Sequence, residues 1–249
     1  MRLLVPPGVF RPISDSWLLA RCAARLAPGA RVLELCTGSG AIAIDAARHG
    51  ARQVVAVDVS RRAVLTARFN ARLNGVRVDA RRGDLLDAVR GERFDLIVSN
   101  PPYVPAVDGG VPTRGLKRAW DAGPDGRALL DRILAQAPRA LAPGGTLLVV
   151  HSSICGEDQT LERLRSAELR AEVAACETGP LGPLMRGRAE LLEERGLLAP
   201  GAREEEVLVI QGQSPRRRAG TTPPQTATSD VTTSVAVSTS SLSASPVEA

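Results

Sequence analysis

The sequence predicts an α/β fold with a doubly wound, mostly parallel sheet of seven strands and an antiparallel strand at its C-terminal end. Short apolar runs rich in Val, Ile and Leu alternate with longer segments of helical periodicity, which is the spacing of repeated strand–helix–strand units. Acidic or amide side chains follow several of these runs directly. Because the carboxyl ends of parallel strands meet at one edge of a sheet, these polar side chains predict a ligand site there.

Length and composition are those of one soluble globular domain. The 249 residues are 44% hydrophobic and 24% charged, enough for an ordinary core. The net charge of +5 permits an acidic or nucleic-acid partner without requiring one, because the arginines are scattered along the chain. Four separated cysteines and two histidines predict neither a disulfide framework nor a metal centre, and a reducing, cytoplasmic compartment is expected. With no signal-peptide layout and no apolar run of spanning length, no membrane association is expected.

In the N-terminal half, predicted strands and helices alternate regularly. A first helix is expected over residues 17–26, with Asp15 or Ser16 as its N-cap and Pro28-Gly29 at its end. The predicted strands that follow cover residues 31–36, 53–58, 76–81 and 94–99, and the helices between them cover residues 41–49 and 61–73.

The C-terminal half continues the pattern after a Gly/Pro-rich loop that runs to about Trp120. An amphipathic helix is predicted over residues 127–141, and the glycines after Pro143 end it. The remaining elements are a strand over 146–150, a helix over 158–167, and two strands over 172–176 and 206–210 that pair around an excursion at 181–198. We therefore expect three parts: residues 1–30 packing on the ligand site, an α/β domain over 31–212, and a Ser/Thr/Pro-rich, disordered tail over 213–249.

The tetrapeptide Asn100-Pro101-Pro102-Tyr103 stands directly after the strand predicted over 94–99. Its prolines stop the strand and remove two N–H donors, so the remaining polar groups are acceptors: the Asn100 side-chain oxygen and the Pro101 carbonyl. Such a corner suits a planar NH2 group, which donates two hydrogen bonds. Tyr103 supplies a flat apolar wall beside it. By itself the tetrapeptide is also consistent with a proline turn, and the upstream residues decide between the two.

A glycine loop, Thr37-Gly38-Ser39-Gly40, follows the first predicted strand and opens onto a helix N-terminus. It lacks the third glycine of a dinucleotide site and the Gly-Lys-Ser/Thr ending of a phosphate loop. Asp58 ends the second strand, where a carboxylate can accept from both ribose hydroxyls, and Asp84 follows the third, where it can accept from an exocyclic amine. Together, polar groups at successive strand ends favour a nucleoside-containing ligand.

These segments resemble the Rossmann-like class I S-adenosylmethionine-dependent methyltransferases, and more narrowly the HemK/PrmC group of protein-glutamine N5-methyltransferases. The resemblance includes the motif from Arg11 to Ser16 before the first helix and the motif from Trp120 to Gly126. It implies S-adenosylmethionine as cofactor, no metal, and methyl transfer to a glutamine amide held by Asn100, Pro101, Pro102 and Tyr103, with Asn100, Pro101 and Tyr103 as the catalytic set. The cofactor-binding residues it implies are Thr37, Gly38, Gly40, Asp58, Asp84, Leu85 and Asn100.

The chain departs from the family in two ways. Cys36 stands where the first glycine of the loop usually lies, and only about 30 residues precede the first strand, where bacterial release-factor enzymes carry a helical substrate-recognition domain. The second departure resembles the short eukaryotic and archaeal type, which works with a small partner protein. The resemblance therefore implies a protein substrate, with a release factor expected, and a small activating subunit.

Three alternatives remain open from the sequence. The same corner could accept the exocyclic amine of adenine, with Tyr103 stacked on a flipped base of DNA or RNA, although aromatic residues are only 2% of the chain. A non-catalytic nucleoside-binding or adaptor protein would use residues 216–249 as an interaction arm. A nicotinamide dehydrogenase is the least favoured, because the third glycine is missing.

Overall fold

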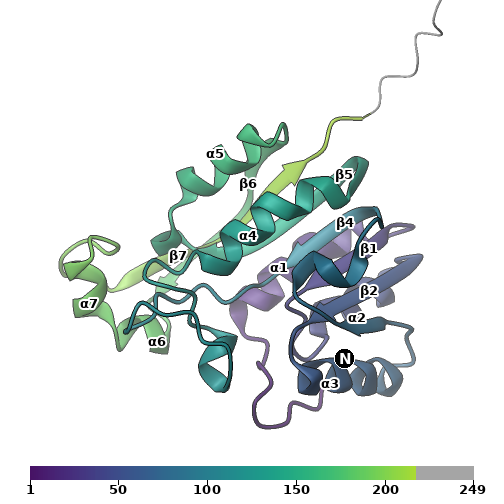
Figure 1. The fold of residues 1–249 in the computed structure, drawn as a ribbon, viewed down its shortest axis with the longest axis horizontal. Coiled ribbons are helices and arrows are strands. Elements are labelled where there is room, and N and C mark those ends of the chain that lie inside the picture. The colour runs from purple at the N-terminus through teal and green to yellow at the C-terminus, as the bar shows by residue number, and fades with distance from the viewer. Residues whose placement is uncertain (217–249) are drawn as a thin grey trace, which may run out of the picture. The chain divides into compact units, whose positions relative to one another are not determined.

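In the computed structural model, which describes residues 1–216, the centre of the fold is one seven-stranded sheet of order β3-β2-β1-β4-β5-β7-β6 (Figure 1). The strands β1 to β5 are parallel, and β7 runs antiparallel to both of its neighbours. The strands are β1 (Arg31–Leu35), β2 (Gln53–Asp58), β3 (Asp79–Arg82), β4 (Phe94–Ser99), β5 (Leu141–Ser152), β6 (Arg170–Pro180) and β7 (Glu204–Gln213). The predicted fold class is confirmed.

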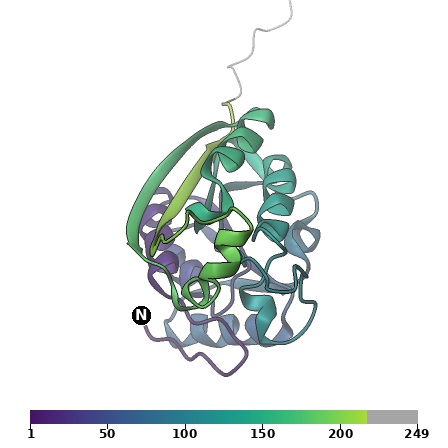
Figure 2. The ribbon, with the colours of Figure 1, turned by 90° about the vertical axis from the view of Figure 1, so that its left-hand side faces the viewer.

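Helices cover both faces of the sheet, so its central strands are apolar on both sides (Figures 1 and 2). One face packs against α1 (Ser14–Leu26), α2 (Ala41–Arg48) and α3 (Arg61–Leu73). The other packs against α4 (Ala128–Gln136) and α5 (Glu157–Ser166). Two short helices, α6 (Pro183–Arg186) and α7 (Ala189–Glu194), lie between β6 and β7.

The main difference from the sequence prediction lies at the start of α1. The helix begins at Ser14 and its N-cap is Ile13, which makes no side-chain capping bond. Asp15 and Ser16, which we expected as caps, instead lie in the first turn and are buried. Their side chains bind residues that follow β4, and this tertiary contact replaces the local cap.

A second difference lies between α4 and β5. The helix predicted over 127–141 ends at Gln136, and a 3-10 turn, η3 (Ala137–Ala140), leads directly into β5. The glycines after Pro143 therefore lie within a strand, at a register shift against β4. At Gly145 a Cβ would lie 2.9 Å from the carbonyl oxygens of Ala142 and Phe94, so only glycine lets the strand pass here. β3 is shorter than predicted, and β6 and β7 are longer because they pair with each other along most of their length.

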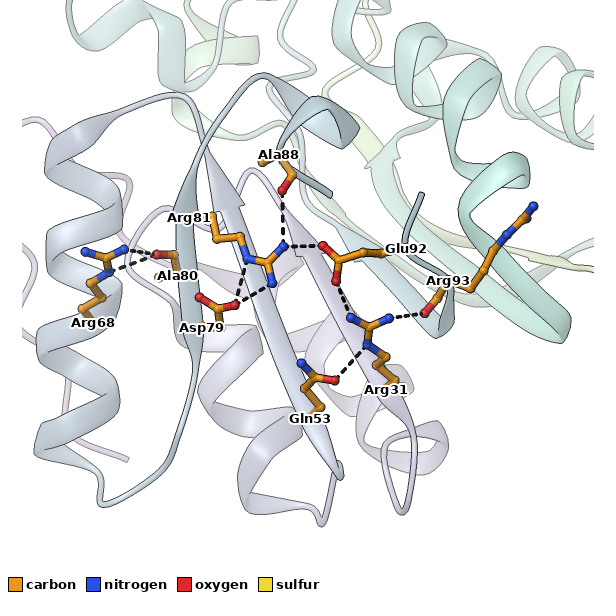
Figure 3. A network of polar contacts seen from close by, with 9 residues as sticks. All are labelled: Arg31, Gln53, Arg68, Asp79, Ala80, Arg81, Ala88, Glu92 and Arg93. Carbon is orange, nitrogen blue, oxygen red and sulfur yellow. Dashed lines mark hydrogen bonds and ion pairs between the residues drawn. The ribbon is translucent and has the colours of Figure 1, made fainter. Parts of the chain in front are cut away.

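A polar network joins the first strands to the segment before β4 (Figure 3). Glu92 binds both Arg31, which begins β1, and Arg81 in β3. Arg81 also donates to the carbonyl of Ala88, 3.3 Å away, in the 3-10 helix η1 (Leu85–Val89). The network thereby holds the turn that carries Asp84 and Leu85 against the sheet.

The N-terminal segment runs beside α3 (Figure 1). Two asparagines one helical turn apart, Asn70 and Asn74, hold it there. The Asn70 Oδ1 accepts from the Leu4 amide at 2.9 Å, and its Nδ2 donates to the Leu4 and Ser39 carbonyls, both at 2.9 Å. Asn74 makes the equivalent pair of bonds with Arg2. Each asparagine side chain thus bonds both the N–H and the C=O of one residue of the N-terminal segment, as a neighbouring β-strand would.

The end of the predicted domain falls within β7, whose last residue is Gln213. The Ser214 amide then donates to the Gly145 carbonyl at 2.9 Å. The rest of the predicted tail, residues 217–249, lies outside the described residues. Within residues 1–216, no helix is long and apolar enough to cross a membrane.

Candidate active site

A cavity of about 720 Å³ opens at the carboxyl ends of β1, β2 and β4. Residues that follow these strands line it, as the topology of a parallel sheet predicts. Of the cofactor- and substrate-binding residues expected from the sequence, those that line the cavity are Gly38, Asp58, Asp84, Leu85, Asn100, Pro101, Pro102 and Tyr103. Thr37 and Gly40 do not line it.

Thr37 and Gly40 instead shape the glycine loop from behind. Thr37 is buried, and its hydroxyl donates to the Glu34 carboxyl group. Gly40 has φ of 82°, and a Cβ there would lie 2.8 Å from the Cβ of Ala67 in α3. Glycine is therefore required for the loop to turn into α2 against α3.

Cys36 takes the left-handed conformation that a glycine would adopt at no steric cost. Its φ is 58°, which is unusual for a residue with a Cβ, and it lines the cavity next to Gly38. The departure from the family pattern is therefore a strained position of the backbone at the site itself. Leu85, which also lines the cavity, is strained in the same way, with φ of 48°.

Glu34 is a buried acid beneath the glycine loop that the sequence analysis did not single out. Its Oε2 accepts from the Ala43 amide at 3.0 Å as well as from Thr37. Burial raises the pKa of Glu34 to about 8, so the carboxyl group holds its proton near neutral pH. The sequence signal that could have identified Glu34 is an acidic residue between two leucines in a predicted buried strand.

Asp58 organises the loop and also faces the cavity. Its Oδ2 accepts from the Gly38 amide at 3.0 Å and its Oδ1 from the Ser60 amide at 2.8 Å. Each oxygen keeps a further lone pair for a ligand. Asp84, which follows the neighbouring strand β3, also lines the cavity and pairs at 2.7 Å with Arg132 of α4, where both side chains are about half exposed.

Asn100 and Tyr103 are held by the first turn of α1. The Asn100 Nδ2 donates to the Ser16 Oγ at 3.1 Å, and the Tyr103 hydroxyl donates to the Asp15 Oδ2 at 2.8 Å. Because Asn100 uses its donor on Ser16, its Oδ1 remains as an acceptor, and within residues 1–216 it makes no hydrogen bond. The acceptor corner expected from the sequence is thus oriented by two residues that we had expected only to cap a helix.

The motif from Trp120 to Gly126 braces the other side of the corner. The Val104 amide donates to the Trp120 carbonyl at 2.8 Å, and the Ala122 amide donates to the Val104 carbonyl at 3.0 Å. A Cβ on Gly126 would lie 2.2 Å from the Tyr103 carbonyl oxygen, so no larger residue fits there without moving the corner.

In the part of the chain from Met1 to Arg216, no three His, Cys, Asp or Glu side chains are grouped so that they could hold an ion. Asn100 and Pro101 both line the cavity, and a side-chain amide oxygen and a backbone carbonyl oxygen can each accept from an N–H donor.

The known proteins that this chain resembles in sequence are methyltransferases. The family model of the Methyltransferase small domain matches residues 5–112. A Methanocaldococcus jannaschii protein named for N5-glutamine methyltransferase activity is 36% identical over 185 residues, which are 74% of this chain and 93% of that protein. The release factor glutamine methyltransferase of Geobacter sulfurreducens is 39% identical over 153 residues, which are 59% of this chain and 54% of the relative. The chain thus spans about half the length of that bacterial enzyme.

Solved structures share the fold at lower identity. The E. cuniculi Mtq2–Trm112 complex, responsible for methylation of the eRF1 termination factor, superimposes with a TM-score of 0.57 at 22% identity, covering 83% of this chain and 99% of the matched chain. The T. thermophilus 16S rRNA N2 G1207 methyltransferase, in complex with AdoMet and guanosine, gives a TM-score of 0.54 at 24% identity, covering 84% of this chain and 46% of that one. The fold, the cavity at the strand ends and the alignment that covers 93% of the Methanocaldococcus jannaschii protein lead to one conclusion: this chain belongs to the HemK/PrmC-like group of class I S-adenosylmethionine-dependent methyltransferases.

Proposed function

We propose that this chain transfers a methyl group from S-adenosylmethionine to the side-chain amide nitrogen of a glutamine in a protein. The observation that carries the proposal is the oriented corner: one Asn100 N–H bonds Ser16, the Asn100 Oδ1 makes no hydrogen bond within residues 1–216, and Asn100 and Pro101 both line the cavity. A primary amide has two N–H bonds to donate to such a pair. The glutamine named by the relatives matches this chemistry.

The same cavity offers a place for the cofactor. Gly38 would lie against its methionine part, and Asp58 would accept from the ribose hydroxyls with the lone pairs that Gly38 and Ser60 leave free. Leu85 would pack on the adenine, with Asp84 beside it. Thr37 and Gly40 would support this site from behind the loop.

The residues of the corner would act by positioning. When bound, S-adenosylmethionine supplies a methyl group on a positively charged sulfur. An amide nitrogen is a weak nucleophile because its lone pair is delocalised, and the two acceptors would hold that nitrogen with its lone pair toward the methyl carbon. Tyr103, fixed by Asp15, would keep the amide plane in place. As the N–C bond forms and the S–C bond breaks, the nitrogen would release one proton to solvent.

An apolar mouth favours a protein acceptor over nucleic acid. Ile13, Val111 and Leu184 line the cavity and are 50%, 46% and 40% exposed, respectively. Exposed apolar side chains around a site are typical of a protein-binding surface, whereas nucleic-acid sites gather phosphate-binding cations. We therefore place a protein such as a release factor first and adenine in DNA or RNA second.

The proposal is tested by transfer of tritiated methyl from S-adenosylmethionine to a release factor, a tRNA pool and plasmid DNA in parallel. Label is expected in the release factor, and it should disappear when the labelled glutamine, located by mass spectrometry, is replaced. Asn100→Ala should lower kcat by about 10²-fold or more, as the loss of a positioned hydrogen-bond partner does. Asn74→Ala is the control, because Asn74 bonds Arg2 and does not line the cavity. It should keep kcat within a few-fold.

Two results would contradict this function. Label confined to nucleic acid would promote the adenine alternative, and near-normal turnover by Asn100→Ala would remove the corner from the mechanism. Binding of S-adenosylmethionine without transfer to any of the three acceptors would favour the binding-protein alternative or a missing subunit.

We also propose that a small activating subunit supports this enzyme. The support is the likeness of the fold to Mtq2, which was solved as a complex with Trm112. The measurement is kcat of the purified chain alone and after co-purification from its own host, with full activity of the isolated chain as the contradicting result.

A further inference from the structure

Two segments far apart in the sequence are joined into one unit at the outer side of the cavity. The first is the loop over residues 104–124, which follows the Asn100 corner. The second is the excursion over residues 181–203, which carries α6 and α7 (Figures 1 and 2). They share a small apolar core, separate from the two cores of the sheet, that consists of Val104, Ile154, Leu181, Met185, Ala189, Leu192 and Leu198. Tyr103 and Trp120 pack against it.

Two arginines of the excursion fasten the loop. The Arg188 Nη1 lies 2.6 Å from both the Pro105 carbonyl oxygen and the Asp121 Oδ1, in an ion pair where the side chains are 12% and 4% exposed. Asp121 belongs to the motif that begins at Trp120. Its ion pair with Arg188 has no part in the proposed methyl transfer.

Arg195, at the opposite end of α7 from Arg188, fastens the same loop. It donates to the carbonyls of Ala106 and Pro124 at 2.8 and 3.0 Å, and to that of Val107 at 2.9 Å. Such guanidinium contacts to several carbonyls hold the backbone of a loop that has little regular structure of its own. We call Arg188, Asp121 and Arg195 the latch.

The fastened unit presents apolar side chains at the mouth of the cavity. Val111 comes from the loop, Leu184 from α6 and Ile13 from the N-cap of α1, and all three line the cavity. Each is exposed by 40% or more, although most leucine, isoleucine and valine side chains of the fold are buried. Val111 and Leu184 lie on the two segments that the latch joins. Exposed apolar side chains on a fastened unit at the mouth of a cavity have the properties of a preformed docking surface.

We propose that Ile13, Val111 and Leu184 form the acceptor-docking surface of this enzyme and that the latch holds it in place. It takes a folded protein that presents apolar side chains beside the methylated glutamine, and it contributes to acceptor affinity rather than to methyl transfer. This inference rests on the proposed function of the same cavity. Arg188 and Arg195 are positioning residues, because they touch the loop and not the reacting atoms.

The surface is tested with Leu184→Asp in the full chain. Leu184 is 40% exposed, so the substitution leaves the cores unchanged. We expect KM for the protein acceptor to rise about tenfold or more, as at an interface anchor. The Kd of S-adenosylmethionine by calorimetry and the kcat at saturating acceptor should stay within twofold. Leu73→Asp on α3, where the leucine is 43% exposed, is the matched control and should leave KM unchanged.

The latch is tested with Arg188→Lys and with the double variant Arg188→Met/Asp121→Leu. The double variant removes both charges, so that neither is left buried without a partner. Its KM for the acceptor should rise by at least the factor seen with Leu184→Asp, with Kd for the cofactor unchanged, and Arg188→Lys should restore part of the affinity. A folded double variant, checked by its thermal transition, is required for the comparison.

The outcomes separate this inference from the function on which it rests. A wild-type enzyme that labels no protein acceptor overturns both. A wild-type enzyme that labels its protein acceptor, with KM unchanged in Leu184→Asp, overturns the docking surface alone. Weakened cofactor binding in either variant would assign the surface to the cofactor side and would also overturn it.

Discussion

At the scale of single residues, the site stores strain in its first loop. Cys36 adopts a φ of 58°, where the Cβ of an L-residue meets the following carbonyl. The Cys36 side chain packs in part against the core that contains Leu33 and Leu35 of β1, so replacing Cys36 changes both packing and strain. Comparing two small replacements separates these effects, because alanine and glycine both remove the thiol and only glycine relieves the strain.

We therefore expect Cys36→Gly to be more stable than Cys36→Ala by about 1 kcal/mol in free energy of unfolding. At an ordinary strand position the order is reversed, with glycine less stable than alanine by about 0.5–1 kcal/mol. The same pair of replacements at Cys176, which lies in β6, provides that control. Urea midpoints for the four variants make the measurement, and an alanine variant at 36 as stable as the glycine variant would show that the backbone is unstrained.

Glu34 makes stability depend on pH. Burial raises its pKa from about 4.5 in the unfolded chain to about 8 in the folded protein. Between these values the unfolded chain releases a proton that the folded protein keeps. This contribution to stability is therefore complete at low pH and is lost as pH rises through about 8.

Replacing Glu34 by glutamine should remove this pH dependence. We expect the wild-type free energy of unfolding to fall by up to about 1.4 kcal/mol per pH unit between pH 5 and 8 from this group. Glu34→Gln should lack that component, whereas Glu162→Gln, at an exposed position in α5, should retain it. Equal slopes for Glu34→Gln and the wild type would mean that Glu34 is ionised in the folded protein.

At the scale of elements, α3 connects the N-terminal segment to the glycine loop. Asn70 is fully buried and binds Leu4 on one side and the Ser39 carbonyl on the other. The segment then continues to Gly8, Val9 and Phe10, which line the cavity. One side chain therefore joins the outer segment to the loop expected to hold the cofactor.

Asn70→Leu keeps the size of the side chain and removes its hydrogen bonds. It should lower the free energy of unfolding by about 1–3 kcal/mol, because the buried Ser39 carbonyl and the part-buried backbone groups of Leu4 lose their partner. Hydrogen exchange of the Leu4 amide should accelerate at least tenfold by the same loss. Asn74→Leu is the control, since its bonds to Arg2 are exposed and should cost less. Unchanged exchange at Leu4 would show that the N-terminal segment is held by other contacts.

At the scale of the whole molecule, the cavity draws its walls from both halves of the chain. Gly38 follows β1 and Asp58 ends β2, whereas Leu184 lies in α6 and Glu205 in β7. A ligand that fills this cavity should bind only the folded protein and so stabilise it.

Addition of S-adenosylmethionine at 100 times its Kd should therefore raise the free energy of unfolding by about 2.7 kcal/mol. In Asp58→Ala the gain should fall to nearly zero at the same concentration, because the ribose loses its acceptor and the Gly38 amide loses its anchor. Thermal unfolding with and without cofactor makes the comparison, and adenosine triphosphate at equal concentration controls for general nucleotide effects. A full gain in Asp58→Ala would place the cofactor elsewhere.

Much of this architecture follows from the sequence itself. The apolar runs identified β1, β2 and β4 to within a residue, and their spacing identified the parallel sheet. The polar residues after those runs indicated the edge at which the cavity lies. The physical reason is local: strand formation depends on the side chains of the run, and parallel pairing brings the residues after each run together.

Only the tertiary structure decided how the corner is oriented. Asp15 and Ser16 are good helix caps by local chemistry, yet they bind Tyr103 and Asn100, which lie 88 and 84 positions along the chain. The latch likewise joins Asp121 to Arg188 across 67 positions, and no local pattern predicts such a pair. Residue type determined what the site can do, namely accept hydrogen bonds at the end of a strand. Packing determined how the Asn100 amide is oriented, because a side chain with a donor and an acceptor takes its orientation from whichever partner the fold places beside it.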